Sequence, residues 1–186
     1  MLKPARAIGI ALILVLPITV FMHSVAVRPA WADELDDDAA AALRSLYEGS
    51  PAARVLGEKA VGILVFPNIV KAGFLFGAQF GEGTLYRGGR KVANYRSVAA
   101  SYGFQAGVQA FGYAMFFMTK AALEYLNKSG GWEVGVGPSI VVVDTGIARN
   151  LTTTTIQSDV YAFVFDQRGL MAGVGIQGSK ITRVNH

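Results

Sequence analysis

Acid–base and metal chemistry would need histidine, cysteine or carboxylate side chains, and the first two are scarce. Histidine occurs only at His23 and at His186, the last residue. A catalytic triad or a metal site built on histidine in the body of the chain is therefore almost excluded. The sequence contains no cysteine, which excludes disulfides, thiolate metal ligands, a cysteine nucleophile and a lipidated N-terminal cysteine.

Carboxylates are the remaining candidates for acid–base catalysis. The motifs of serine hydrolases, zinc proteases, phosphate-binding loops and dinucleotide-binding loops are all missing. Glu82 and Glu133 each adjoin glycine in an apolar stretch, where a strand residue facing solvent is the simpler interpretation. We predict a protein that is not an enzyme and has no cofactor and no metal site. The carboxylates considered are Glu82, Glu133, Asp144, Asp159 and Asp166.

Basic residues cluster around one expected β-hairpin, which could bind an anion. The sequence from Gly83 to Tyr95 predicts two strands joined by a two-residue turn at Gly88-Gly89. This register places Arg87 opposite Arg90, and like charges that face each other across two strands are destabilising. Lys91 and Arg96 complete this basic cluster. Its side chains either extend into solvent or bind an anionic ligand.

The first 32 residues have the pattern of a secretory signal peptide. Lys3 and Arg6 precede the apolar run Ile8 to Met22, and Ala30-Trp31-Ala32 is a suitable cleavage site. The alternative is an uncleaved membrane anchor, because the segment from Ile8 to Val27 is about as long as a bilayer span. We expect residues 33–186 to form one exported domain, periplasmic or extracellular and peripheral to a membrane.

The net charge of the whole chain says little about its partners. The sequence has 17 Lys and Arg residues against 13 Asp and Glu. Three of the basic residues, Lys3, Arg6 and Arg28, and none of the acidic ones lie in the predicted signal peptide, which leaves 14 against 13. Whole-chain basicity therefore does not indicate nucleic-acid binding, and we predict none.

The stretch from Val70 to Tyr86 is expected to organise the fold. If it is extended, Phe74, Phe76, Ala78 and Phe80 share one face. The opposite face is nearly bare, which predicts that another backbone, a sheet or a helix, packs unusually close to it. A ligand groove is the alternative. The bare face consists mainly of Gly73, Gly77, Gly81 and Gly83.

The remaining patterns predict a single α+β domain rich in antiparallel sheet, sandwich-like or barrel-like, with two short N-terminal helices and one helix in mid-chain. The second helix begins at Ser50-Pro51, and Thr119 caps a helix that runs to about Lys128. Trp132 to Val143 is expected to be extended, and a second hairpin is predicted with its turn at Asp166 to Gly169. Two further glycine pairs, Gly135 with Gly137 and Gly173 with Gly175, are expected to pack against the first glycine face.

Several separated motifs occur in a fixed order along the chain. They are Phe66-Pro67, Lys71-Ala72-Gly73, Gly77, Gly81-Glu82-Gly83, Ser101-Tyr102-Gly103 with Gln105, Gly107 and Gln109, Phe117-Met118-Thr119, Trp132-Glu133-Val134-Gly135, and the closing segment from Phe163 to Thr182. Together they resemble the SYLF domain, a lipid-binding family, and the similarity extends from about Leu43 to Val184.

The resemblance implies binding of a lipid surface rather than catalysis. Eukaryotic members bind phosphoinositides and some bind actin, whereas bacterial members are often small exported lipoproteins; this chain lacks their lipid-attachment cysteine. The partner we expect is anionic phospholipid or a membrane surface, and actin binding enters only by analogy. A structural or protein-binding role in the cell envelope is the alternative, and the oligomeric state stays open. The expected lipid-binding residues are Lys71, which lies in a matching motif, and the hairpin residues Arg87, Arg90, Lys91 and Arg96.

Overall fold

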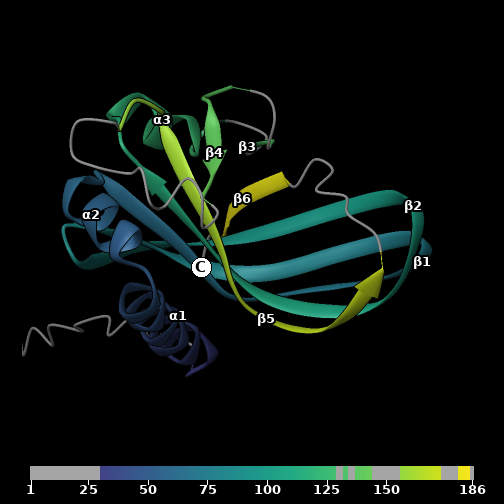
Figure 1. Cartoon of the computed structure of the whole chain (residues 1–186). Helices are drawn as coiled ribbons and strands as arrows, with labels where there is room; N and C mark the ends of the chain where they lie inside the picture. Colours follow the sequence, from purple (N-terminus) through teal and green to yellow (C-terminus); the bar gives the residue numbers. More distant parts are fainter. Residues whose placement is uncertain (1–29, 129–131, 134–136, 144–155, 173–179, 185–186) are drawn as a thin grey trace, which may run out of the picture.

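An α+β fold is present, as the sequence predicts, with three helices and six strands in the described part of the chain. The computed structural model describes residues 30–128, 132–133, 137–143, 156–172 and 180–184 (Figure 1). The elements are α1 (Ala30–Gly49), α2 (Pro51–Lys59), β1 (Gly62–Arg87), β2 (Arg90–Phe117), α3 (Lys120–Tyr125), β3 (Trp132–Glu133), β4 (Ile140–Val142), β5 (Val160–Ala172) and β6 (Lys180–Val184).

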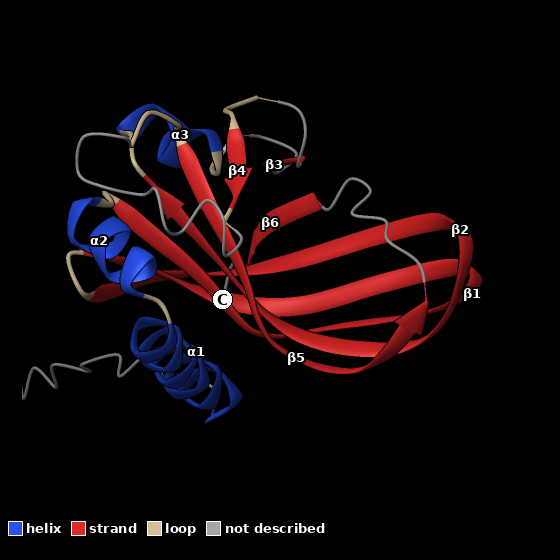
Figure 2. Ribbon diagram, viewed as in Figure 1, coloured by secondary structure: helices blue, strands red, loops and turns tan. Residues whose placement is uncertain are grey.

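The six strands form one curled, mixed sheet that resembles a half-barrel. The strand order is β3-β6-β2-β5-β4, and β1 pairs with β2. All pairings are antiparallel except that of β4 with β5, so the predicted antiparallel character is confirmed with one parallel pair added. Figure 2 shows the helices gathered at one end of the sheet, while the β1–β2 hairpin curls away from them at the other end.

Strand β1 doubles back on itself, and the glycine face lies inside this bend. A Cβ atom on Gly83 would lie 2.5 Å from the carbonyl oxygen of Val65, and one on Gly81 would lie 2.7 Å from Cγ1 of Ile69. Nearer the bend, a Cβ on Gly73 would lie 2.6 Å from the Cα of Gly77. The backbone that packs against these glycines is therefore the first half of the same strand. Only glycine permits so close an approach.

Two hydrophobic cores lie on the two faces of the curled sheet. The inner core includes Phe66, Tyr95 and Phe117 from the long hairpin, together with Leu123 and Leu126 from the α3 region. The outer core joins the sheet to α1 and α2, and it contains Ala39, Leu46, Leu56, Val65, Ala114, Phe116 and Phe163. Helices α1 and α2 therefore cover the outer face at the helix end of the sheet only.

Local signals placed the helix starts correctly. The Ser50 hydroxyl accepts a hydrogen bond from the Ala53 amide at 3.3 Å, and Pro51 is the first residue of α2. The Thr119 hydroxyl accepts one from the Ala122 amide at 3.2 Å, which begins α3. Such caps satisfy backbone donors that the first turn of a helix leaves free. Helix α3 ends at Tyr125, earlier than the predicted end near Lys128.

The predicted turn at Gly88-Gly89 is confirmed, with φ of 54° and 74°, and Arg87 lies opposite Arg90. Positive φ at both turn residues matches the right-handed twist of a hairpin and favours glycine. The hairpin itself is much longer than expected, because β1 and β2 span 26 and 28 residues.

The prediction of a second hairpin at Asp166 to Gly169 is wrong. Strand β5 continues through these residues, and β2 pairs with it on both sides, at Gly112 with Phe165 and at Ala110 with Arg168. Asp166 and Gly169 adopt positive φ of 50° and 87°. Together with the register shift between Ala110 and Gly112, this backbone forms a bulge within one strand instead of a reversal.

Two other expectations for the C-terminal half need correction. Trp132 to Val143 contains two short strands, β3 and β4, rather than one extended run. A Cβ on Gly137 would meet the ring of Tyr125 at 2.5 Å, so this glycine packs against α3 and not against the glycine face of β1. Its predicted partners Gly135, Gly173 and Gly175 lie outside the described residues.

Candidate functional site

The most unusual surface is a row of exposed apolar side chains on the outer face of the β1–β2 hairpin. Phe74 is 72% exposed, Phe76 69% and Val108 59%. Monomeric soluble proteins rarely leave so many large apolar groups together in water, and such patches mark interaction surfaces. We call this surface the apolar band; its residues are Val70, Ala72, Phe74, Phe76, Ala78 and Phe80 of β1 and Val98, Ala100, Ala106 and Val108 of β2.

The alternation of the sequence produces the band. Successive side chains of a strand point to opposite faces, so packing the glycines inside the bend turns the phenylalanines outward. Cross-strand pairing then completes the surface, because Phe74 lies opposite Ala106, Ala78 opposite Ala100 and Phe80 opposite Val98. The band occupies the end of the curled sheet that the helices leave uncovered (Figures 1 and 2).

Two basic residues on the neighbouring strands pair with β2 in line with residues of the band. Lys180 of β6 pairs with Val98, which pairs with Phe80, so the three residues share one face. At the other end Arg168 of β5 pairs with Ala110, which pairs with Val70. Both cations are exposed. Sequence reasoning missed them, because only the strand pairing brings them to the band.

The two lysines among the expected lipid-binding residues do not belong to a solvent-facing basic cluster. Lys71 is buried, with 7% of its surface exposed, and pairs with Gln109 in the middle of the hairpin. The Lys91 ammonium forms an ion pair with the Asp36 carboxylate of α1. The same carboxylate accepts a hydrogen bond from the Thr84 hydroxyl at 2.9 Å, so this cluster attaches α1 to the sheet.

The three expected arginines are separated along the hairpin. Arg87 and Arg90 are exposed beside the turn. Arg96 forms an ion pair with Glu82 at 2.8 Å, and its guanidinium carbon lies 5.5 Å from the centre of the Phe80 ring. Arg96 thus borders the apolar band, whereas Arg87 lies seven residues further along β1 from Phe80, about 23 Å at about 3.3 Å per residue. The structure does not bring the five predicted cations into one site.

The candidate carboxylates that the structure describes, Glu82, Asp159 and Asp166, do not form a catalytic pair with one another. Glu82 pairs with Arg96. Asp159 accepts a hydrogen bond from the Thr119 hydroxyl at 3.2 Å. Asp166 is exposed on the β5 bulge, and Asp144 lies outside the described residues, as does the side chain of Glu133. Within the described ranges no group of three His, Cys, Asp or Glu side chains could hold a metal ion.

Burial against α1 perturbs one tyrosine beside the hairpin turn. The Tyr86 hydroxyl donates a hydrogen bond to the backbone carbonyl of Asp36 at 3.0 Å. Burial, followed by the negative charge of Asp36, raises the pKa of Tyr86 to about 12. The group is therefore neutral at physiological pH and holds the helix rather than moving protons.

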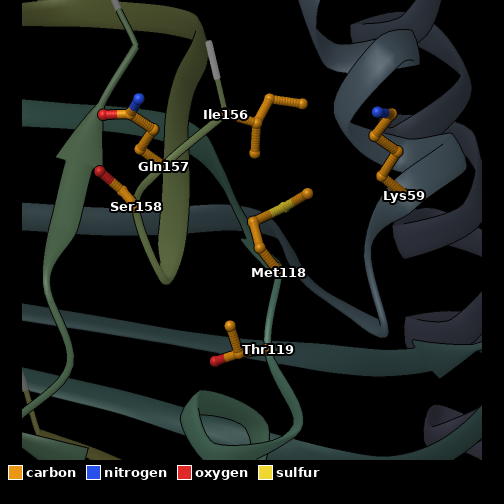
Figure 3. Close-up of a pocket in the computed structure, with 6 residues that line it drawn as sticks. All are labelled: Lys59, Met118, Thr119, Ile156, Gln157 and Ser158. Carbon is orange, nitrogen blue, oxygen red and sulfur yellow. The ribbon is translucent and has the colours of Figure 1, made fainter. Parts of the chain in front are cut away.

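A small cavity of about 300 Å³ lies between the end of α2 and the segment before β5. Figure 3 shows Lys59 across from Gln157 and Ser158, with Met118 and Thr119 between them and below. The amides of Gln157 and Ser158 donate to the Tyr161 hydroxyl at 3.1 and 3.2 Å, so they are not directed at a ligand. The lining residues include neither a carboxylate nor an imidazole, and the cavity offers no acid–base pair.

Two larger grooves adjoin α1. One of about 950 Å³ separates the α1–α2 corner from β4 and β5, with Leu46, Val143 and Phe163 among its lining residues. Another of about 520 Å³ lies between the helices and the hairpin turn and is lined in part by Arg44 and Glu58. These volumes would admit a small molecule. Their apolar walls belong largely to the outer core.

Comparison with known proteins agrees with this picture of a binding domain. Residues 98–186 match the family model of Ysc84, described as Las17-binding protein actin regulator. Residues 98–186 therefore match the SYLF family. The resemblance drawn from the sequence motifs is thereby confirmed, over a match that covers most of β2 and all later elements. No curated protein matches the chain. Among the described residues, no helix is long and apolar enough to cross a membrane.

Proposed function

We propose that this protein is an exported, non-enzymatic module that docks reversibly on membranes containing anionic phospholipid. The observation that carries the proposal is the apolar band, which presents phenylalanine and valine side chains to solvent on one face. Moving apolar area out of water gains roughly 25 cal/mol per Å², so a surface of this kind gains free energy when it meets the acyl region of a bilayer.

The basic residues at the ends of the band favour a membrane surface that carries anionic lipid. Lys180 and Arg168 stand at the two ends of the band, and each basic residue near an anionic membrane contributes about 1 kcal/mol. Two cations alone would hold the domain weakly. Combined with apolar contact, they give binding that is stable yet reversible.

A protein partner is the alternative. The matching family is described as a Las17-binding actin regulator, and an apolar surface also suits a protein interface. If that alternative is correct, the same band would be covered by protein instead of lipid. The decisive experiment therefore has to expose the purified chain to lipid alone.

Vesicle flotation with matched valine variants tests the proposal. Val98→Ser/Val108→Ser removes two valines of the band, which are 47% and 59% exposed. Val92→Ser/Val142→Ser removes two valines outside it, which are 45% and 44% exposed, and serves as the control. The intact chain is used throughout, so residues 1–29 are the same in every sample.

We expect the intact chain to float with vesicles of phosphatidylglycerol and phosphatidylcholine more than with phosphatidylcholine alone. The band variant should bind the mixed vesicles roughly 5- to 30-fold more weakly, since losing two half-exposed valines removes about 1 to 2 kcal/mol. The control variant should bind like the original chain. Equal binding by both variants would contradict the role of the band, and absence of binding by the original chain would contradict the proposed function.

A further inference from the structure

We propose that the bend of the β1–β2 hairpin dips into the membrane surface, with the apolar band around the outside of the bend in the acyl boundary and with Lys180 and Arg168 on lipid phosphates at the two ends of the band. This inference rests on the proposed function and specifies the docking face and the group recognised. The proposed docking face is the end of the sheet opposite the hairpin turn, whereas the sequence favoured the turn as the lipid-binding site.

The register of the sheet carries the inference. Directly paired residues of antiparallel strands share a face, so Phe80, Val98 and Lys180 form one row and Val70, Ala110 and Arg168 another. On the face of the band, the pairs between these rows, such as Phe74 with Ala106, bear no charge. A long cationic side chain at the edge of an apolar surface can keep its stem in the apolar layer and place its head among phosphates.

The two end cations form no ion pair with the side chains that the structure describes, whereas Lys91 is held by Asp36 and Arg96 by Glu82. Glu133 lies opposite Lys180 in the pairing of β3 with β6, and its side chain is outside the described part of the chain. A cation that no described carboxylate holds can bind a phosphate without breaking any ion pair among the described residues. The band is therefore complementary to an anionic lipid surface in charge as well as in polarity.

The turn end of the hairpin is a poorer match for such a surface. Helix α1 contacts β1 and β2 there through Asp36, which binds Thr84 and Lys91. The N-terminal half of the same helix exposes four further carboxylates, which would be repelled by anionic lipid. They are Asp33, Glu34, Asp37 and Asp38.

Site-specific labelling tests which end meets the bilayer. The chain has no cysteine, so each single-cysteine variant of the intact chain takes one label. Ala78→Cys and Ala100→Cys place an environment-sensitive fluorophore on the band, Arg90→Cys places it beside the turn, and Ala121→Cys is the control at an exposed alanine of α3. The vesicles contain phosphatidylglycerol and phosphatidylcholine, with a nitroxide quencher on the acyl chain.

The two band labels should brighten several-fold on vesicle addition and be quenched by the acyl-chain nitroxide, while the Arg90 and Ala121 labels stay unchanged. If only the Arg90 label responds, the turn docks, and this inference is overturned while the proposed function stands. If no label responds and the chain does not float, both are overturned. Band labels that respond to protein concentration without vesicles would overturn the inference in favour of contact between copies.

Charge reversal provides the second test, in two variants that change the net charge equally. Lys180→Glu/Arg168→Glu should weaken binding to the anionic vesicles by at least about 10-fold. Arg87→Glu/Arg90→Glu, at the turn, should leave it within about 3-fold of the original chain. The reverse order of effects would overturn the inference, and circular dichroism of both variants shows that each is folded.

Discussion

Replacing Gly83 by alanine should destabilise the fold, because the doubling back of β1 leaves no room for a side chain there. The new Cβ would lie 2.5 Å from the carbonyl oxygen of Val65 and 2.6 Å from Cδ1 of Phe66. The oxygen belongs to the backbone of a paired strand, and the Phe66 ring is buried in the inner core. Neither group can move far without breaking other contacts.

The magnitude follows from the cost of overpacking. Extra volume in a packed interior typically costs 1 to 3 kcal/mol, and we expect about 2 kcal/mol for Gly83→Ala. For a chain of this size that corresponds to a decrease in Tm of about 4 to 8 °C. Differential scanning calorimetry or urea unfolding of the intact chain measures the change.

Gly49→Ala is the matched control for this prediction. No atom lies within 4 Å of a Cβ built on Gly49, at the end of α1. Alanine should therefore leave the stability within about 0.5 kcal/mol or raise it slightly. If Gly83→Ala is as stable as the original chain, the two halves of β1 do not pack against each other, and the outward orientation of the phenylalanines loses its explanation.

Two further predictions concern pH and processing. Burial raises the pKa of Tyr113 to about 12, so the folded state stays protonated where the unfolded state ionises. The stability that the neutral Tyr113 side chain contributes should be fully present below pH 10 and should decline from about pH 10 to about pH 12. In Tyr113→Phe the urea midpoint should decline less over this pH range. An equal decline in the variant and the original chain would contradict the prediction. Sequencing of the protein recovered from its cells should begin at Asp33, whereas a start at Met1 would favour the uncleaved anchor.

Local features of the fold could be predicted from the sequence because neighbouring residues determine them. Ser50 and Thr119 cap their own helices, and the glycine pair at 88 and 89 adopts the backbone angles that its turn requires. The bare glycine face correctly indicated a close backbone. The sequence did not show that this backbone is residues 62–70 of the same strand, because the contact depends on how the whole hairpin curls.

The Asp166 to Gly169 segment shows the limit of local signals. Its residues suit a turn, and the backbone does adopt positive φ at both ends of the segment. Pairing with β2 continues on either side, so the same conformations produce a bulge. Tertiary pairing thus decided between two structures with the same local chemistry.

The candidate site was harder to predict than the fold. The sequence showed which strand residues are aromatic, but not that helices α1 and α2 stop short of them. Lys91 looked available until the fold placed Asp36 beside it, 55 residues earlier in the chain. Lys180 reaches the Phe80 row only because β6 pairs with β2.

Photo-crosslinking from the band identifies the molecules that cover it. A benzophenone derivative of phenylalanine replaces Phe74 in the intact chain, with the same derivative at Val92 as the control, and both are irradiated in the cells that make the protein. We predict phospholipid adducts from position 74, identified by mass spectrometry, and few or none from position 92. Adducts from position 74 to another protein or to a second copy of the chain, without lipid, would contradict the account.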